Sequence, residues 1–98
     1  MENSRMVCIL SVELRQEGGE SIAHCPELRL TDHGKTDEEA ESRLRSAVVS
    51  FVQICARKGT LFSVLSERGI LKMDRHPERF IEVPIPVLAF EHARAAIR

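Results

Sequence analysis

The sequence has no tryptophan and no tyrosine, and its only aromatic residues are four phenylalanines. So few rings leave little for a base-stacking platform, since several of them are needed in a core. The formal net charge is only -1, which gives the chain no general attraction to phosphate. These two shortages argue against autonomous nucleic-acid binding.

Long apolar runs are also missing. No stretch is long and uncharged enough to span a bilayer, and Met1–Arg5 is not followed by the apolar region and cleavage site of a signal peptide. We therefore expect a cytoplasmic protein with no membrane association. A length of 98 residues with 43% hydrophobic content predicts one domain, residues 1–98, around one core.

Pairs of the Cys-x-x-Cys type, which zinc sites normally use, are absent from the sequence. Cys8, Cys25 and Cys55 are odd in number, far apart and set in apolar contexts, so we interpret them as buried free thiols. His24 adjoins Cys25, but no other histidine completes a zinc spacing. Neighbouring strand residues also point to opposite faces, which disfavours a nucleophile–base pair there. We expect no metal site, cofactor or catalytic residue.

The sequence does contain a well-marked helix start. Thr36 followed by Glu39 is a capping box, in which the hydroxyl accepts from the third helical amide and the carboxylate reaches back to the cap amide. Asp37–Glu39 places carboxylates where the helix dipole favours them, and Gly34 is expected to supply backbone freedom for the preceding turn. An apolar stripe then follows at spacings of three and four: Leu44, Ala47, Val48, Phe51, Val52 and Cys55. The helix is predicted to end at Arg57-Lys58-Gly59.

Strand patterns surround this helix. Met6–Arg15 alternates with a period of two, Gln16–Glu20 carries the glycine pair of a hairpin, and Ser21–Cys25 is the return strand. Arg29–His33 predicts a third strand. Phe80–Leu88 predicts a fourth, and its two prolines confine it to an edge, a bulge or a strand end.

The remaining segments complete the predicted architecture. Thr60–Arg68 has apolar residues at helical spacing and predicts a short second helix, whereas Lys72–Arg79 is polar and predicts an exposed connection. Phe90–Arg98 is helix-prone and predicts a docked or frayed terminal helix. The fold class is α+β: a three-stranded antiparallel meander plus a fourth strand, with one long amphipathic helix on the sheet and a short second helix.

Two motifs carry a resemblance to a known family. Pro26-Glu27-Leu28 ends a strand, and Gly34-x-Thr36-x-x-Glu39-Ala40 opens the long helix. Together with the preceding hairpin and the amphipathic helix, these segments resemble the HicB family of antitoxin-like domains. The similarity covers roughly Met6 to Lys58.

The resemblance implies a partial, catalytically degraded ribonuclease-H-like domain. Such a domain binds HicA, a small ribonuclease toxin, and blocks its active site or RNA-binding surface, so the implied role is binding and not catalysis. Many family members carry a further DNA-binding segment, whereas only Ala89–Arg98 follows the last predicted strand here, so we expect no separate DNA-binding domain. Arg29-Leu30 stands where many family members have a Pro-Gly-Cys-like insertion, so we expect the contacts with the toxin to differ from those of these family members.

The candidate partner-binding residues are polar groups near the sheet edge and the helix start: Arg29, Asp32, His33 and Lys35. The expected partner is a HicA-like toxin, met through an edge strand or an uncovered sheet face. The same features predict self-association as a homodimer or a higher even-numbered assembly.

Two alternatives stay open. One is a small metal-dependent hydrolase or nuclease, in which Asp32 and the helix-start acids Asp37, Glu38 and Glu39 bind magnesium or manganese and activate water. It requires these carboxylates to converge. The other is an orphan oligomeric binding domain with no toxin partner.

Overall fold

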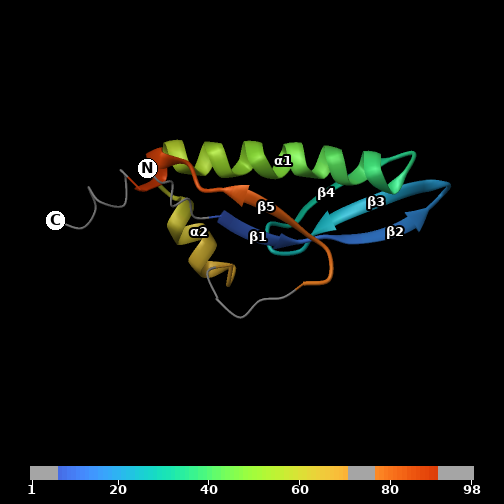
Figure 1. Cartoon of the computed structure of the whole chain (residues 1–98), viewed down its shortest axis with the longest axis horizontal. Helices are drawn as coiled ribbons and strands as arrows, with labels where there is room; N and C mark the ends of the chain where they lie inside the picture. The colour runs from blue at the N-terminus through green and yellow to red at the C-terminus, as the bar shows by residue number, and fades with distance from the viewer. Residues whose placement is uncertain (1–6, 71–76, 91–98) are drawn as a thin grey trace, which may run out of the picture.

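A computed structural model describes residues 7–70 and 77–90 of the chain (Figure 1). The elements, in chain order, are β1 (Val7–Ser11), β2 (Glu13–Glu17), β3 (Glu20–Cys25), β4 (Leu30–Gly34), α1 (Asp37–Lys58), α2 (Leu61–Glu67) and β5 (Phe80–Pro84). The predicted α+β class is confirmed, with its antiparallel meander, long helix and short second helix. The helix expected over the C-terminal tail and most of the loop expected before β5 lie outside the described residues.

The meander has the strand order β2-β3-β4. Gly18 and Gly19 form the two-residue turn between β2 and β3, with φ of 58° and 82°, values that most side chains disfavour. The register places Arg15 opposite Ile22 in β3, and Ala23 of β3 opposite Asp32 in β4. The hairpin predicted from the glycine pair is therefore confirmed.

The first predicted strand is not a single paired unit. Its first half, β1, pairs with β5 in a two-stranded antiparallel sheet, and its second half, β2, pairs with β3. Val12 stands between the two halves, and its N–H donates to the Arg79 carbonyl at 2.9 Å. The alternation of inward and outward residues continues through Val12, which is buried like Leu10. One chain segment thus has different partners on its two edges, and the sequence pattern does not show where the partner changes.

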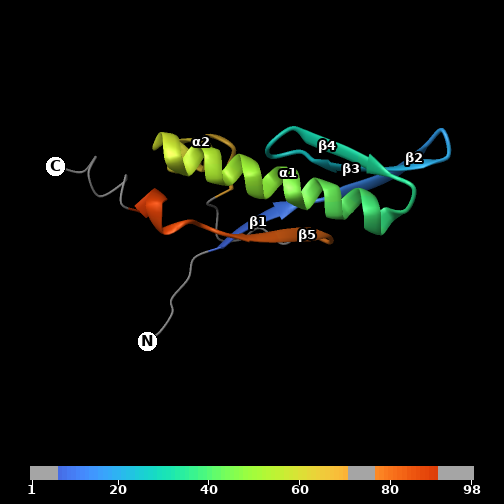
Figure 2. The same ribbon diagram turned by 90° about the horizontal axis from the view of Figure 1, so that it is seen from above.

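Helix α1 covers one face of both sheets, as the two views show (Figures 1 and 2). Its buried stripe is Ala40, Leu44, Val48, Val52, Cys55 and Ala56. This stripe packs on inward residues such as Leu10, Ala23 and Ile81, each with no exposed surface, and α2 adds the buried Leu61 and Leu65. A single core follows from one helix lying across both sheets.

The fourth predicted strand is shorter than expected. β5 lies at an edge, beside β1 alone, as its prolines required. It ends at Pro84, however, and residues 87–90 are helical, so the prediction of a strand through Leu88 is wrong. Pro86 contributes to this change, because its carbonyl accepts from the Ala89 N–H at 3.0 Å and starts the helical turn. Phe90 then packs on Phe62 of α2, with ring centroids 5.4 Å apart.

The helix start follows the predicted capping box with one difference. The Thr36 hydroxyl accepts from the Glu39 N–H at 3.0 Å, as expected. The Glu39 carboxylate reaches one residue further back and accepts from the Lys35 N–H at 2.7 Å, not from the amide of Thr36. At the other end, Gly59 closes α1 in the left-handed conformation with φ of 75°.

Gly34 serves a purpose other than the predicted backbone freedom. The described glycines with a positive φ are Gly18, Gly19, Gly59 and Gly69. Gly34 is not one of them, so its backbone conformation is open to residues that have a side chain. A Cβ at this position would instead lie 2.8 Å from the Ala40 nitrogen and 2.8 Å from the Glu39 Cβ. Gly34 is needed because the first turn of α1 rests directly on β4.

Candidate functional site

The face of the sheets that points away from α1 has no helix lying across it among the described residues (Figures 1 and 2). We call it the outer face. It consists of the odd-numbered residues from 7 to 17, the even-numbered residues of β3 and β5, and Thr31 and His33 of β4. All of these side chains are exposed or half-buried. The outer face arises because each strand has a period of two and only one side of the sheets meets a helix.

One end of the outer face, the part over β1 and β5, is mainly apolar and carries one charged residue, Glu82. Val7 on β1 is 44% exposed and Phe80 on β5 is 43% exposed. Val7 lies opposite Pro84 and Phe80 lies opposite Ser11, so the two stand at opposite ends of the β1–β5 ladder, with Ile9 and Glu82 between them. Exposed large apolar side chains on a sheet face without a covering helix are typical of binding surfaces.

The other end of the outer face is polar and carries both signs of charge. His33 Nδ1 lies 3.4 Å from a Glu20 carboxylate oxygen, and His24 Nδ1 lies 2.7 Å from the Thr31 hydroxyl. Arg15 Nε lies 3.8 Å from the Glu17 carboxylate. Exposed pairs of this kind add little stability. Their groups are therefore available to exchange partners when another molecule binds.

The predicted partner-binding residues do not share one surface. His33 lies on the outer face and is exposed, whereas Asp32 points to the α1 side and is half-buried. Arg29 and Lys35 are exposed on the turns at the two ends of β4, and Arg29 has a positive φ of 57°. The alternation within a strand already separates Asp32 from His33, so sequence reasoning had the signal that these two neighbours diverge.

Asp32 has a structural task at the open edge of β4. Its Oδ1 accepts from the His33 N–H at 2.9 Å, while the His33 carbonyl accepts from Arg43 Nη1 at 3.4 Å. The next outward N–H along this edge, that of Lys35, is bonded to Glu39. Side chains thus occupy the outward N–H groups of His33 and Lys35, which discourages an additional strand along this part of the edge. Asp32 is one of the side chains that do this.

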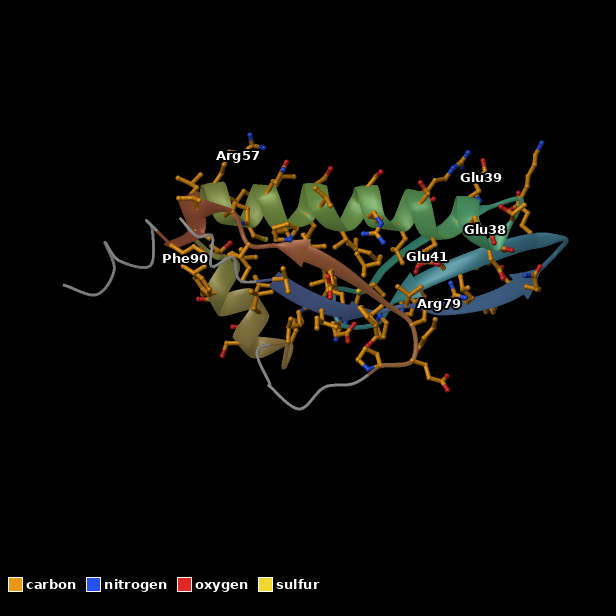
Figure 3. All side chains as sticks on the ribbon, in the orientation of Figure 1. Glu38, Glu39, Glu41, Arg57, Arg79 and Phe90 are labelled. Carbon is orange, nitrogen blue, oxygen red and sulfur yellow. The ribbon has the colours of Figure 1, made fainter. Side chains whose placement is uncertain are left out.

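Two of the three acids of the helix start, Asp37 and Glu39, bond to separate partners, and Glu38 is exposed (Figure 3 labels Glu38 and Glu39). Asp37 accepts from the buried Ser21 hydroxyl at 2.7 Å and from Gln16 Nε2 at 3.1 Å. Glu39 also pairs with Arg43 at 3.1 Å. The Lys35 N–H, followed by the nearby positive charge of Arg43, lowers the pKa of Glu39. Within residues 7–70 and 77–90 no three His, Cys, Asp or Glu side chains gather as metal ligands, so the hypothesis of a metal site at Asp32 gains no support.

Glu27 of the Pro-Glu-Leu motif joins two parts of the sheet system. Its carboxylate accepts from the Ser11 N–H at 3.0 Å and from the Ser11 hydroxyl at 2.6 Å. Ser11 is the last residue of β1, where the chain changes partners, and Glu27 lies in the turn between β3 and β4. The adjacent Leu28 is buried. The sequence analysis used this motif only for the resemblance. It did not predict the bond from Ser11 to Glu27, because these residues are 16 positions apart in the chain.

Cys25 lies beside the same carboxylate. Its thiol is fully buried and lies 3.5 Å from Glu27 Oε1. Burial, together with the nearby negative charge of Glu27, raises the pKa of Cys25 to about 11. Cys8, Cys25 and Cys55 form no disulfide and are all buried, as predicted. The elevated pKa makes Cys25 a poor nucleophile at neutral pH.

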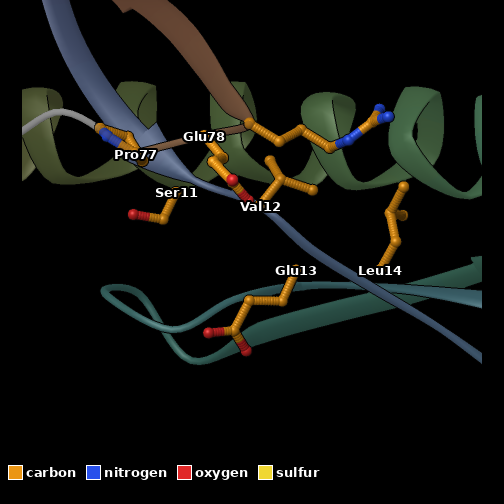
Figure 4. A pocket seen from close by; sticks show the side chains of 7 residues that line it. Ser11, Val12, Glu13, Leu14, Pro77 and Glu78 are labelled. Carbon is orange, nitrogen blue, oxygen red and sulfur yellow. The ribbon is translucent and has the colours of Figure 1, made fainter.

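A groove of about 470 Å³ lies where β5 and β2 both begin (Figure 4). One wall is the strand segment 11–14, and the other is the segment 77–79 that leads into β5. Arg79 on the second wall pairs with Glu41 of α1 at 2.6 Å (Figure 3). The groove marks the point at which the open edge of β2 starts.

Comparisons with known proteins give no relative: no family model, curated protein or solved structure matches the chain. The resemblance to the HicB family therefore stays a prediction. Among the described helices, none combines the length and the apolar character that crossing a bilayer requires.

Proposed function

We propose that the chain is a non-catalytic protein-binding module of the HicB-like antitoxin type, which neutralises a HicA-type mRNA-cleaving toxin by direct binding. The observation that carries the proposal is the outer face, a sheet surface with no covering layer among the described residues and with an apolar end at Val7 and Phe80. Burying those side chains against a partner is favourable because it removes apolar surface from water.

The bonding of the acidic residues supports a binding role over a hydrolytic one. Glu27, Asp37 and Glu39 each accept hydrogen bonds that hold the fold together. A metal-dependent hydrolase needs carboxylates that converge on one ion. Here Glu27 of the Pro-Glu-Leu motif and Asp37 and Glu39 of the helix start stabilise the fold, and in this proposal the outer face binds the partner.

The apolar end is proposed to anchor the toxin, and the polar end is proposed to orient it. Interface energy is concentrated in buried apolar and aromatic anchors, while charged groups at the rim set approach and specificity. Phe80 and Val7 are the anchors in this proposal. His33, Arg29 and Lys35 stand at the polar end and its margins, so three of the four predicted contact residues keep a place in it.

The test compares two identical substitutions at two surfaces. The chain is co-expressed with any small basic protein encoded beside it, and the mass of the complex and RNA cleavage are measured. Val7→Asp alters the outer face, whereas Val87→Asp alters a valine that is 72% accessible and stands between Pro86 and Leu88, two residues that line a hollow with Arg57 of α1. We expect Val7→Asp to weaken the complex about tenfold or more and to restore cleavage, with Val87→Asp behaving as wild type.

Two outcomes contradict the proposal in different ways. If no stoichiometric complex forms and cleavage is unaffected by the chain, the antitoxin role is refuted and an orphan binding domain is favoured. If the complex forms but responds to Val87→Asp and not to Val7→Asp, the role holds and the outer face is refuted as the toxin site.

A further inference from the structure

The edge of β2 that faces away from β3 has unpaired backbone groups. In a hairpin closed by a two-residue turn, Glu17 and Glu20 exchange both backbone bonds, and the same exchange recurs at every second residue. The odd-numbered residues of β2 therefore bond to β3. The N–H and C=O groups of Leu14 and Gln16 point the other way, and no partner for them exists within residues 7–70 and 77–90. It is the same edge of the segment 7–17 that pairs with β5 along β1.

The protection seen at the edge of β4 is missing at this edge. There, side chains bond the outward groups of His33 and the outward N–H of Lys35, whereas here no side chain among the described residues bonds the backbone of Leu14 or Gln16. Charged residues on an edge strand normally discourage pairing. In β2, however, the charges alternate in sign on the outer face, as Glu13, Arg15 and Glu17. Alternating charges repel a second copy in some registers and attract it in others.

The antiparallel registers of β2 with a second β2 are few and can be compared one by one. A two-fold axis at Arg15 places the two arginines opposite each other and Glu13 opposite Glu17 of the second copy, so every pair repels. An axis at Leu14 gives attractive pairs but requires the Val12 N–H, which already donates to Arg79. Both registers are disfavoured for physical reasons visible in the structure.

An axis at Gln16 meets neither obstacle. It places Arg15 opposite Glu17 of the second copy twice, once on each side of the axis, and these opposite charges attract. The outward N–H and C=O groups of Gln16 then bond with those of Gln16 in the second copy. Leu14 comes opposite Gly18 of the second copy. The free backbone groups of β2 thereby gain partners without breaking any backbone bond of the single chain, and Arg15 and Glu17 exchange their exposed pair within the chain for pairs across the axis.

The groove beside β2 fits the same register. With Leu14 opposite Gly18, the glycine turn of the second copy lies beside strand residues 12–14, which form one wall of the 470 Å³ groove. Gly18 and Gly19 have nothing within 4 Å of where a Cβ would stand, so this turn is slender and unobstructed. A turn without side chains is well suited to approach a groove between two backbone segments.

We propose that two copies of this chain associate through β2, antiparallel and in the register centred on Gln16, forming one sheet that continues across the dimer. This pairing uses the edge of β2 and leaves the apolar end of the outer face accessible. It is independent of whether a toxin is the partner of that face.

Cross-linking tests the register directly. Backbone-bonded residues that lie opposite each other have Cα atoms about 5.5 Å apart, within the roughly 4.4–6.8 Å that a disulfide spans. Mild oxidation of the Gln16→Cys variant of the full chain is therefore expected to give a covalent dimer. The matched control is Arg15→Cys, at another exposed position. In this register residue 15 lies opposite residue 17 of the second copy, so the Cα atoms of the two copies of residue 15 are about 8 Å or more apart, too far for a disulfide. The three natural cysteines are buried, so wild type is a second control.

A charge exchange tests the same proposal without cysteine. Arg15→Glu places two glutamates opposite each other at two positions, and we expect the dimer dissociation constant to rise about tenfold or more. Adding Glu17→Arg to that variant restores both attractive pairs and is expected to return the constant toward that of wild type. Light scattering or sedimentation over a wide concentration range gives these constants, and circular dichroism checks that each variant is folded.

Three results would overturn the proposal. One is a monomer at every concentration tested. The second is a dimer in which Arg15→Cys cross-links and Gln16→Cys does not, which indicates another register. The third is a dimer with no response to Arg15→Glu, which indicates another surface.

Discussion

Gly34→Ala is the substitution that most directly tests how the helix start sits on the sheet. The added methyl group would lie 2.8 Å from the Ala40 nitrogen and the Glu39 Cβ and Cγ. Ordinary carbon contacts are about 3.5–4.0 Å, so the first turn of α1 must move by roughly 1 Å. The nearest atom belongs to the backbone, and rotation of a side chain alone does not relieve the contact.

The expected change in the free energy of unfolding of Gly34→Ala follows from two opposing effects. Overpacking a tight site costs about 1–3 kcal/mol. Replacing glycine with alanine where the backbone permits it stabilises by about 0.4–1 kcal/mol, because the unfolded chain loses freedom. The net effect is a destabilisation of about 1–2 kcal/mol, since Gly34 has no positive φ to add further strain.

Urea unfolding followed by circular dichroism measures this change as a lower midpoint at unchanged slope. Gly18→Asn is the control, because its site has open space and a positive φ that asparagine tolerates, and we expect a change within about 0.5 kcal/mol. A Gly34→Ala protein as stable as wild type, or more stable, would refute the close packing of α1 on β4.

Three further substitutions test the bonds described above, and urea unfolding measures each of them. Thr36→Ala removes the acceptor for the Glu39 N–H and is expected to cost about 1 kcal/mol, whereas Thr36→Ser should be nearly neutral; equal losses would contradict a capping role. Glu27→Ala leaves the Ser11 N–H and hydroxyl without their acceptor and is expected to cost about 1–3 kcal/mol, while a neutral result would show that water replaces the carboxylate. For Cys25, the thiol of the unfolded chain ionises from about pH 9, its ordinary value, but that of the folded protein only near its pKa of about 11. The contribution of Cys25 to stability is therefore fully present below pH 9 and is lost, on the order of 3 kcal/mol, between pH 9 and pH 11. Cys25→Ala should remove this loss; the same loss in both proteins would assign it to other groups.

Local sequence signals predicted the fold well wherever neighbouring residues decide it. Thr36 and Glu39 marked the start of α1, Gly59 marked its end, and the Gly18-Gly19 pair marked the hairpin. These features depend on bonds within a few residues, which the sequence displays directly.

The features that sequence reasoning missed depend on distant contacts. The change of strand partner at Val12 leaves the period of two intact, so no local signal reports it. The bond from Glu27 to Ser11 and the packing of α1 on Gly34 likewise require the folded arrangement. Among the predicted contact residues, Asp32 and His33 point to opposite faces of β4, as the period of two within a strand requires.

The division of one strand between two partners has a consequence for how the chain is made. β2, β3, β4 and α1 follow one another along the chain and find their partners locally, whereas β1 must wait for β5, whose first residue comes 69 positions after the last residue of β1 (80 minus 11). At a synthesis rate of about 5–20 residues per second, that wait is roughly 3–14 seconds. During this interval the emerging chain presents β1 with its β5-facing edge unpaired, so completion of the sheet is set by the ribosome and not by the rate at which strands meet.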